Sequence, residues 1–309
     1  MNSPPVYLPP DLVSDVETFA FAGDPWHLQK AIFEPIWKRV TGKARIAVLD
    51  TGYSPHDLLP EPVYSKSFIR GESVRDGNGH GNHVAGTALG RDGIGVAPGA
   101  SLLVFKVLSN DGRGSSDGIS QAVREAADQG ADVANLSLGS SSPYEPTREA
   151  LEYAWSKGVI VVCAAGNSGF DGRRNTIGYP ARYHKEALAV GAYRKDGQRS
   201  SFSSGGRELD ICCPGQDIVS CSNNSTSGVR SMSGTSMATP FMAGLLALII
   251  DLMRREGYAD FTGIEAVRAF LAKYTQDKGD PGHDPFWGMG IPRTQDIIAA
   301  LVNDQLSFV

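Results

Sequence analysis

Short apolar segments alternate with amphipathic segments along most of the chain after residue 40. Segments 117–129 and 145–157 have the spacing of amphipathic helices. Strands that are apolar throughout and alternate with helices are typical of a parallel sheet covered on both faces. The pattern therefore predicts an α/β fold with a mostly parallel central sheet between two helical layers. The apolar segments that we expect as strands are 45–49, 101–108, 132–138, 159–165 and 187–192.

The first part of the chain lacks this pattern. Residues 1–24 are rich in proline and acidic residues, and we expect an extended arm there. The segment 26–37 has helical spacing that breaks near Pro35. No repeat or linker divides the remainder, so the sequence predicts one domain over residues 25–309.

Charge and hydropathy exclude two classes of partner. The 309-residue chain has a net charge of −5 at pH 7 and no dense run of Lys or Arg, so we expect no nucleic-acid partner. The longest apolar run, 241–250, is too short to span a bilayer. The N-terminus has no signal-like apolar region, and we expect no membrane partner.

The cysteine pattern favours a reducing compartment. Cys163 lies inside an apolar run, where a buried free thiol is expected. Adjacent Cys212 and Cys213 would point to opposite faces of a strand, so a bridge between them is not expected. No C-x-x-C motif indicates a zinc site, and Cys221 is a candidate exposed thiol.

Two polar side chains stand where buried segments end or begin. Asp50 ends the first apolar strand, at the edge where α/β sheets form their sites. The alternatives are a turn-capping Asp before Gly52 or a phosphoryl-accepting carboxylate, which would need partners that the sequence lacks. Ser236 follows Gly234 at the start of a buried helix, where it could be an N-cap or a nucleophile beside a run of small residues.

Two further segments carry candidate chemistry. Asn167 follows a buried strand in A-A-G-N-S-G, and is either a turn residue or an amide donor to a developing oxyanion. His80 and His83 lie three positions apart in G-H-G-N-H-V-A-G-T. They could form a metal pair, or one could be a catalytic base. A metal pair would need a third ligand, and neither H-E-x-x-H nor a nearby Glu is present.

In combination, four motifs resemble the subtilisin-like serine peptidases. They are V-L-D-T-G, G-H-G-N-H-V-A-G-T, A-A-G-N-S-G and G-T-S-M-A-T-P, and the resemblance extends from about Trp26 to G-M-G-I-P-R. It implies a catalytic triad of Asp50, His80 and Ser236, in the chain order known for subtilisin, with Asn167 as oxyanion donor. The implied activity is that of a serine endopeptidase that acts through an acyl-enzyme and needs no cofactor for its chemistry.

The resemblance also assigns the two histidines. His80 would be the base, and His83 would pack beneath it as a structural residue. The chain departs from the family at Asn82, where Thr is usual, and at Phe241, where His is usual. We expect altered packing near the base and an unaltered triad.

The family binds an extended polypeptide between two segments of the enzyme. Gly178 matches the floor of the pocket for the P1 side chain, which implies a preference for large apolar P1 residues. Arg113 could favour acidic residues further from the scissile bond, or could be a solvated surface residue. The matching substrate-binding residues are Gly112, Arg113, Gly114, Ser137, Leu138, Gly139 and Gly178.

Family members commonly bind calcium, and two cation sites can be compared. Asp57 matches one ligand of the stronger site, but the loop that supplies the others is shortened here. Glu208 and Asp210, with the carbonyls of Ala181 and Tyr183, match a weaker site that suits Ca²⁺ or Na⁺. The alternative is a pair of solvated acids near Arg207.

The N-terminal arm most resembles that of the intracellular branch of the family. V-Y-L-P-P, 6–10, is similar to a short word that this branch carries. We hypothesise that residues 1–24 lie across the cleft as an inhibitory strand, because proline lacks an N–H and resists cleavage. A disordered tail is the alternative.

This resemblance implies a cytoplasmic zymogen that could form a homodimer. A secreted protein is the alternative if Met1 is not the natural start and a signal and prodomain have been removed. Two other functions compete with peptidase activity: a binding protein on an inactive peptidase fold, and phosphoryl transfer through Asp50. The complete triad argues against the first, and the missing partners argue against the second.

Overall fold

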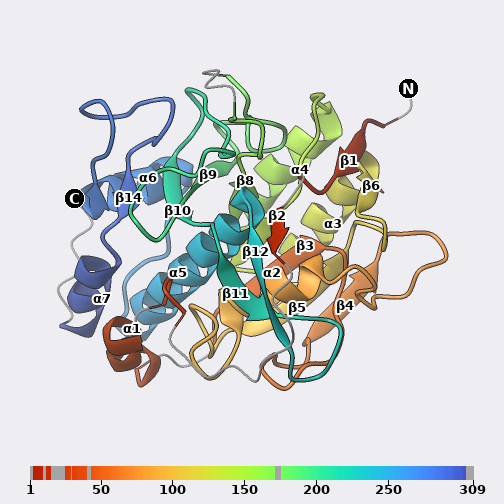
Figure 1. The fold of residues 1–309 in the computed structure, drawn as a ribbon, viewed down its shortest axis with the longest axis horizontal. Coiled ribbons are helices and arrows are strands. Elements are labelled where there is room, and N and C mark those ends of the chain that lie inside the picture. Colours follow the sequence, from red (N-terminus) through yellow and green to blue (C-terminus); the bar gives the residue numbers. More distant parts are fainter. Residues whose placement is uncertain are drawn as a thin grey trace.

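A parallel sheet of seven strands forms the centre of the described part of the chain (Figure 1). The computed structural model describes residues 3–9, 12–14, 25–28, 30–39, 43–170 and 175–303. The strand order in the sheet is β10-β9-β8-β7-β3-β5-β4, and every neighbouring pair is parallel. The strands are β3 (Arg45–Asp50), β4 (Tyr64–Ser67), β5 (Ser101–Lys106), β7 (Val133–Leu136), β8 (Ile160–Ala164), β9 (Leu188–Tyr193) and β10 (Ile211–Pro214).

Helices cover both faces of this sheet. Helices α2 (His80–Leu89) and α5 (Thr235–Arg255) share one hydrophobic core with the sheet. Helices α3 (Ser116–Asp128) and α4 (Glu145–Ser156) share a second core on the opposite face. The fold is therefore the predicted three-layer α/β/α arrangement.

Side chains that alternate along each strand divide between these two cores. In β3, Ile46 and Val48 pack into the core of α2 and α5, while Ala47 and Leu49 pack into that of α3 and α4. Successive strand residues point to opposite faces, so a strand buried on both sides is expected to be apolar at most positions. This pattern explains why five of the strands could be recognised from continuous apolar runs.

The chain changes direction across the sheet at β3. After β3 it forms β4 and β5 on one side, and then β7, β8, β9 and β10 on the other. Such a reversal leaves a crevice at the carboxyl ends of the two strands that flank it. Asp50 ends β3, and Ser137 directly follows β7, so both lie at this crevice.

Smaller elements complete the described structure. Three antiparallel groups pair β1 with β6, β11 with β12 and β2, and β13 with β14. Their bounds are β1 (Pro5–Tyr7), β2 (Leu12–Ser14), β6 (Arg113–Ser115), β11 (Ile218–Cys221), β12 (Val229–Ser233), β13 (Thr275–Gln276) and β14 (Ile291–Pro292). The remaining helices are α1 (Lys30–Trp37), α6 (Ile264–Lys273) and α7 (Thr294–Val302).

Three sequence expectations need correction. Helix α1 continues through Pro35 to Trp37, where a break was expected. Cys221 is buried, where an exposed thiol was considered, and all four cysteines are free. The apolar run 241–250 belongs to α5, a helix long and apolar enough by composition to cross a membrane, although its apolar window is entirely buried in the protein. The boundary of a single domain at residue 25 stays a prediction.

The close contact between α5 and α2 generates a stability prediction. A Cβ at Gly244 would lie 2.6 Å from the Ala88 carbonyl oxygen, a backbone atom that cannot move without shifting α2. We expect Gly244→Ala to lower the free energy of unfolding by roughly 1 to 3 kcal/mol, because it overpacks this interface. Urea unfolding followed by circular dichroism measures the change.

Gly118→Ala in α3 is the matched control, since its nearest atom would be the Ser115 hydroxyl at 3.3 Å. Ala has the higher helix propensity, so this control should be neutral or stabilising. Equal stability of the two variants would contradict the close contact.

Candidate active site

Four polar side chains lie at strand ends and helix starts of the α/β fold. Asp50 ends β3, and Asn167 follows β8. His80 and Ser236 lie in the first turns of α2 and α5, the two helices that pack on the same face. All four are buried, with Ser236 at 0% and His80 at 1% exposure. The fold brings Asp50 into contact with His80, and Asn167 into contact with Thr235, the residue directly before Ser236.

Asp50 and His80 form a short buried contact. The Asp50 Oδ1 atom lies 2.7 Å from His80 Nδ1, and both side chains are 1% exposed. The same oxygen accepts the Thr51 backbone N–H at 2.7 Å, which fixes the carboxylate relative to its own strand. With Asp50 as acceptor, Nδ1 carries the proton, and Nε2 of the neutral ring is the basic nitrogen.

The start of α2 is held by side chains from other segments. Its N-cap residue, Gly79, has φ 96° and provides no side-chain cap. Instead, Asn78 Oδ1 accepts from His80 N at 3.2 Å. Thr51 Oγ1 accepts from Gly81 N at 2.8 Å. Asp76 Oδ2 accepts from Asn82 N, also at 2.8 Å. These bonds satisfy N–H groups that the first helical turn cannot pair internally.

Ser236 is coupled to the loop that follows β7. Ser137 Oγ donates to the Ser236 carbonyl oxygen at 2.8 Å. In a regular helix this carbonyl would accept from residue 240, but Pro240 has no N–H. The proline in α5 therefore leaves an acceptor for Ser137, and the bond ties the start of α5 to one of the predicted substrate-binding segments.

The Asn167 amide has a fixed orientation. Its Oδ1 accepts both the Thr235 backbone N–H and the Thr235 hydroxyl, each at 2.9 Å. The Nδ2 group, with its two donors, therefore points away from Thr235, the residue directly before Ser236. The sequence motifs alone gave Thr235 no role toward Asn167, although its place directly before Ser236 was a usable signal.

His83 lies in the core beneath His80. Its Nε2 donates to the Ile218 carbonyl at 2.9 Å, and the ring is 0% exposed. Burial, with the nearby Arg230 charge as a second cause, holds the pKa of His83 well below its usual value. His83 is therefore neutral at physiological pH and acts as a packing residue.

The two departures from the family pattern also lie inside the protein. The Asn82 amide makes a reciprocal pair with Ser54, accepting from its N–H at 2.7 Å and donating to its carbonyl at 2.9 Å. This pair joins α2 to the segment after β3. Phe241 packs edge-to-face on Phe33 with ring centroids 6.4 Å apart.

The predicted substrate-binding glycines occupy crowded backbone positions. A Cβ at Gly114 would lie 2.2 Å from the Val107 carbonyl, and one at Gly178 would lie 3.1 Å from the Ser140 carbonyl. Gly112 has φ 72°, a conformation that glycine adopts without strain. Ser137 and Leu138 are buried, whereas Arg113 is exposed.

The predicted cation ligands are engaged by other groups. The Asp210 carboxylate accepts from Arg268 Nε and from Ala189 N, both at 2.7 Å. The Tyr183 carbonyl accepts two backbone N–H groups, from Glu186 and Ala187. A cation bound by this set would therefore share Asp210 and the Tyr183 carbonyl with these partners.

The other predicted ligands do not alter this result. Glu208 is 5% exposed and lies 3.0 Å from Arg207 Nε, while Ala181 is buried. Asp57, the remnant of the stronger site, is exposed. Within the described residues, no group of three or more His, Cys, Asp or Glu side chains could hold a metal. A Ca²⁺ or Na⁺ site here stays a prediction.

Serine, histidine and carboxylate side chains near the strand where an α/β sheet reverses its chain direction are typical of a class of hydrolase. The comparisons with known proteins identify the family within this class. The subtilase family, Peptidase_S8, matches residues 42–290. The chain belongs to this family and is a serine endopeptidase of the subtilisin type.

Three relatives illustrate the similarity. Subtilisin BL from Lederbergia lenta is 45% identical over 232 residues, which cover 73% of this chain and 83% of the relative. Subtilisin DY from Bacillus licheniformis is 43% identical over 212 residues, with coverages of 67% and 76%. An intracellular serine protease from Paenibacillus polymyxa is 38% identical over 258 residues, with coverages of 79% and 78%.

The bonds between Thr235 and Asn167 generate a kinetic prediction. Thr235→Val removes the hydroxyl donor to Asn167 and keeps the backbone donor. We expect kcat on a peptide substrate to fall about 10-fold with KM unchanged, a part of the roughly 100-fold that loss of a whole oxyanion donor costs.

Thr239→Val is the matched control. Thr239 lies one turn later in α5, is also buried, and donates its hydroxyl to the Thr235 carbonyl at 2.8 Å rather than to Asn167. The same kcat in both variants would show that the hydroxyl bond to Asn167 has no catalytic role.

Proposed function

We propose that Asp50, His80 and Ser236 form the catalytic triad of this endopeptidase, with Asn167 as oxyanion donor. The observation that carries the proposal is the 2.7 Å contact between Asp50 Oδ1 and His80 Nδ1, together with Ser236 in the first turn of α5. A neutral imidazole held in this tautomer presents Nε2 as a general base.

The proposed reaction has two stages. His80 Nε2 takes the hydroxyl proton as Ser236 Oγ attacks the scissile carbonyl carbon. Asp50 stabilises the imidazolium that forms, and the Asn167 Nδ2 group donates to the oxyanion. The imidazolium then gives its proton to the leaving amine, which leaves an acyl-enzyme on Ser236. Water, activated by the same imidazole, hydrolyses this ester and regenerates the serine.

The substrate would be an extended polypeptide between the two flanking segments 112–114 and 137–139. Gly178, at the position of the P1 pocket floor, supports a preference for large apolar P1 side chains, since it adds no side chain or charge. Arg113 is exposed, so any preference for acidic substrate residues further from the scissile bond would depend on a charge that solvent screens.

We further propose that the N-terminal arm inhibits the enzyme by occupying this cleft. Strand β1 pairs antiparallel with β6, with Val6 opposite Gly114. Tyr7 exchanges two hydrogen bonds with Gly139, at 2.9 and 3.0 Å, and Leu8 N donates to the Gly112 carbonyl at 3.1 Å. The arm therefore uses the same two segments that are predicted to bind substrate, which is the geometry of a β-strand addition.

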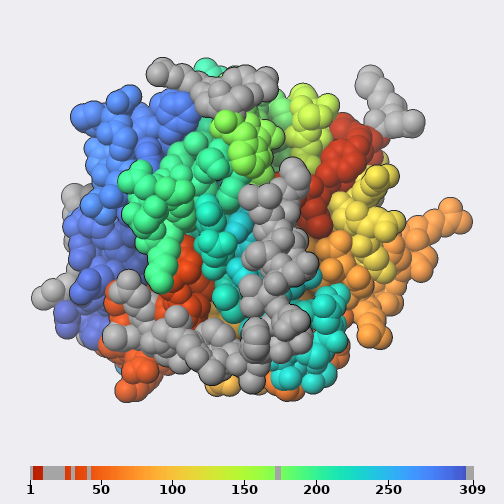
Figure 2. Space-filling model, viewed as in Figure 1, coloured from red at the N-terminus to blue at the C-terminus, as the bar shows by residue number. Residues whose placement is uncertain are grey.

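Burial alternates along the arm as it would for a bound peptide. Val6 is 2% exposed and packs into the core of α3 and α4, where Leu8 also packs, while Tyr7 is 46% exposed. Figure 2 presents residues 3–9 in dark red on the surface beside the yellow residues around β6. The alternation supports an arm held by side-chain pockets as well as by backbone bonds.

A second part of the arm pairs with the strand that precedes Ser236 in the chain. Strand β2 pairs antiparallel with β12, which ends at Ser233, directly before the turn that carries Ser236. Pro10, Asp11 and residues 15–24 lie outside the described residues. Pairing of the arm with both β6 and β12 supports inhibition by occlusion, and the low exposure of Ser236 and His80 agrees with it.

Localisation and assembly remain proposals that rest on similarity. We place the enzyme in the cytoplasm, because a relative named as an intracellular serine protease matches most of the chain and the four cysteines are free. A secreted protein is the alternative. The homodimer also stays a prediction, and no bound metal takes part in the steps proposed above.

Covalent labelling tests the triad. Incubation of the full chain with a fluorophosphonate should give one adduct per chain by intact mass, because only an activated serine attacks phosphorus. Ser236→Ala should abolish the adduct, whereas Ser233→Ala, in the preceding strand, should retain it. If neither the folded parent nor a variant with a weakened arm is labelled, the triad proposal fails and a binding role takes its place.

Substitutions in β1 test inhibition by the arm. Val6→Asp would bury a carboxylate without a partner, so the arm should detach and the labelling rate should rise about 10-fold or more. Tyr7→Asp adds the same charge at the adjacent exposed position and keeps the backbone bonds, so its rate should stay near that of the parent. Equal rates in all three proteins would contradict inhibition by this strand.

A further inference from the structure

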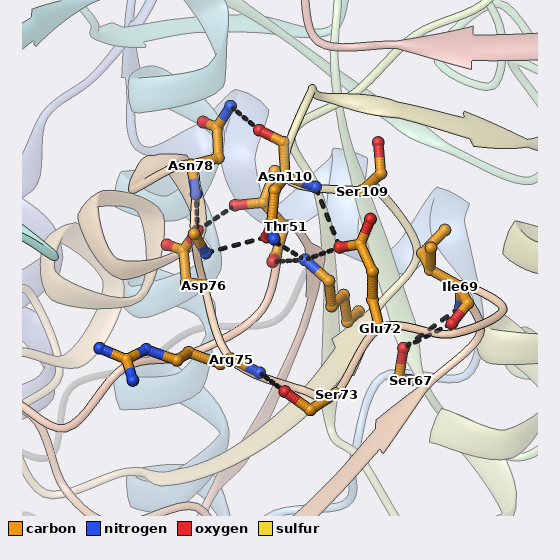
Figure 3. Close-up of polar contacts among 12 residues, drawn as sticks. Thr51, Ser67, Ile69, Glu72, Ser73, Arg75, Asp76, Asn78, Ser109 and Asn110 are labelled. Atoms are coloured by element: carbon orange, nitrogen blue, oxygen red, sulfur yellow. Dashed lines mark hydrogen bonds and ion pairs between the residues drawn. The ribbon is translucent and has the colours of Figure 1, made fainter.

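Asp76 is a buried carboxylate next to the triad to which neither the sequence motifs nor the proposed reaction gives a role. It is 1% exposed. Its Oδ1 accepts from Thr51 Oγ1 at 2.9 Å, Asn78 N at 3.0 Å and Gly79 N at 2.7 Å, and its Oδ2 accepts from Asn82 N at 2.8 Å. Figure 3 presents the Asp76 carboxylate beside Thr51 and Asn78. Four hydrogen bonds offset the cost of removing this carboxylate from water.

The four donors belong to the two segments that carry Asp50 and His80. Thr51 directly follows Asp50 at the end of β3. Gly79 and Asn82 flank His80 at the start of α2. Thr51 Oγ1 also accepts from Gly81 N at 2.8 Å, so the hydroxyl and the Asp76 carboxylate together bridge the strand end and the helix start.

The strand end is held from the opposite direction by a buried lysine. Lys106, at the end of β5, is 0% exposed and donates to the Thr51 carbonyl. Its ammonium also donates to Asn110 Oδ1 at 3.0 Å and pairs with Glu72 at 3.2 Å. Thr51 therefore makes hydrogen bonds through its N–H, its carbonyl and its hydroxyl. These bonds restrict the movement of Thr51 and of the adjacent Asp50.

We propose that Asp76 is a positioning residue for the triad: it binds the end of β3 to the start of α2 and thereby sets the distance between Asp50 and His80. The inference rests on the triad proposed above. Asp76 does not touch the reacting atoms and acts through Thr51 and the first turn of α2. Without it, the N–H groups of Gly79 and Asn82 lose their acceptor, and α2 can shift relative to β3.

The proposal is tested on the full chain with Asp76→Asn, because asparagine keeps the size of the side chain and replaces one acceptor oxygen by a donor. The first readout is the far-downfield proton resonance of the His80 Nδ1–H···Asp50 bond, assigned by its loss in Asp50→Asn. This signal requires neither substrate nor an open cleft. The second readout is the rate of fluorophosphonate labelling.

The matched control is Asp132→Asn. Asp132 is 7% exposed and accepts from Arg45 N at 2.7 Å, and Arg254 lies 2.6 Å away, but it precedes β7 at the opposite edge of the sheet. We expect both variants to lower the melting temperature. Only Asp76→Asn should shift or abolish the downfield resonance and slow labelling, by about 100-fold for a displacement near 1 Å.

An unchanged resonance and an unchanged labelling rate in folded Asp76→Asn would overturn the proposal. If Asp76→Asn does not fold, Thr51→Val tests the same bridge, since it removes the hydroxyl that joins Asp76 to the strand end. Failure of the triad itself has a different signature: the parent would show no resonance that depends on Asp50, and no adduct at Ser236.

Discussion

The position of every group in the proposed active site depends on the reversal of chain direction at β3. Because β5 pairs with one side of β3 and β7 with the other, the loops that leave these strands separate and open a crevice beside Asp50. The helices that fill this space from one face are α2 and α5, and both begin at the crevice. His80 and Ser236 therefore approach Asp50 on helix starts, where backbone N–H groups need external acceptors.

The requirement to pair buried polar groups then specifies the local geometry. At the start of α2 the acceptors are side-chain oxygens of Thr51, Asp76 and Asn78. At the start of α5 the Thr235 N–H donates to the amide oxygen of Asn167. Each bond that satisfies a helix start also orients a residue of the proposed site. The same hydrogen bonds thus pair the backbone N–H groups of the helix starts and orient the residues of the proposed site. Polar substitutions near these helix starts should therefore affect both the stability of the fold and the activity of the enzyme.

Much of this organisation was predictable from the sequence, for identifiable reasons. The strands β3, β5, β7, β8 and β9 are mostly apolar because both faces are buried. The four sequence motifs identified the candidate triad and Asn167. Strand β4, with sequence Y-S-K-S, escaped recognition because it is a half-exposed edge. The contacts that link Asp76 and Thr235 to other segments were not predicted, because those partners are distant in sequence: Thr51 lies 25 residues from Asp76, and Asn167 lies 68 residues from Thr235. Local sequence patterns do not identify such long-range pairs.

The location of Ser236 on a core helix has a consequence for the durability of the enzyme. Helix α5 extends over 21 residues, and all but its last two are buried. Loops and strand edges open by local fluctuation, whereas a central buried helix is released only when the whole core unfolds. The proposed nucleophile should therefore stay in place for as long as the core remains folded, and the working lifetime of the enzyme should depend on its kinetic stability rather than on the loops around the proposed site.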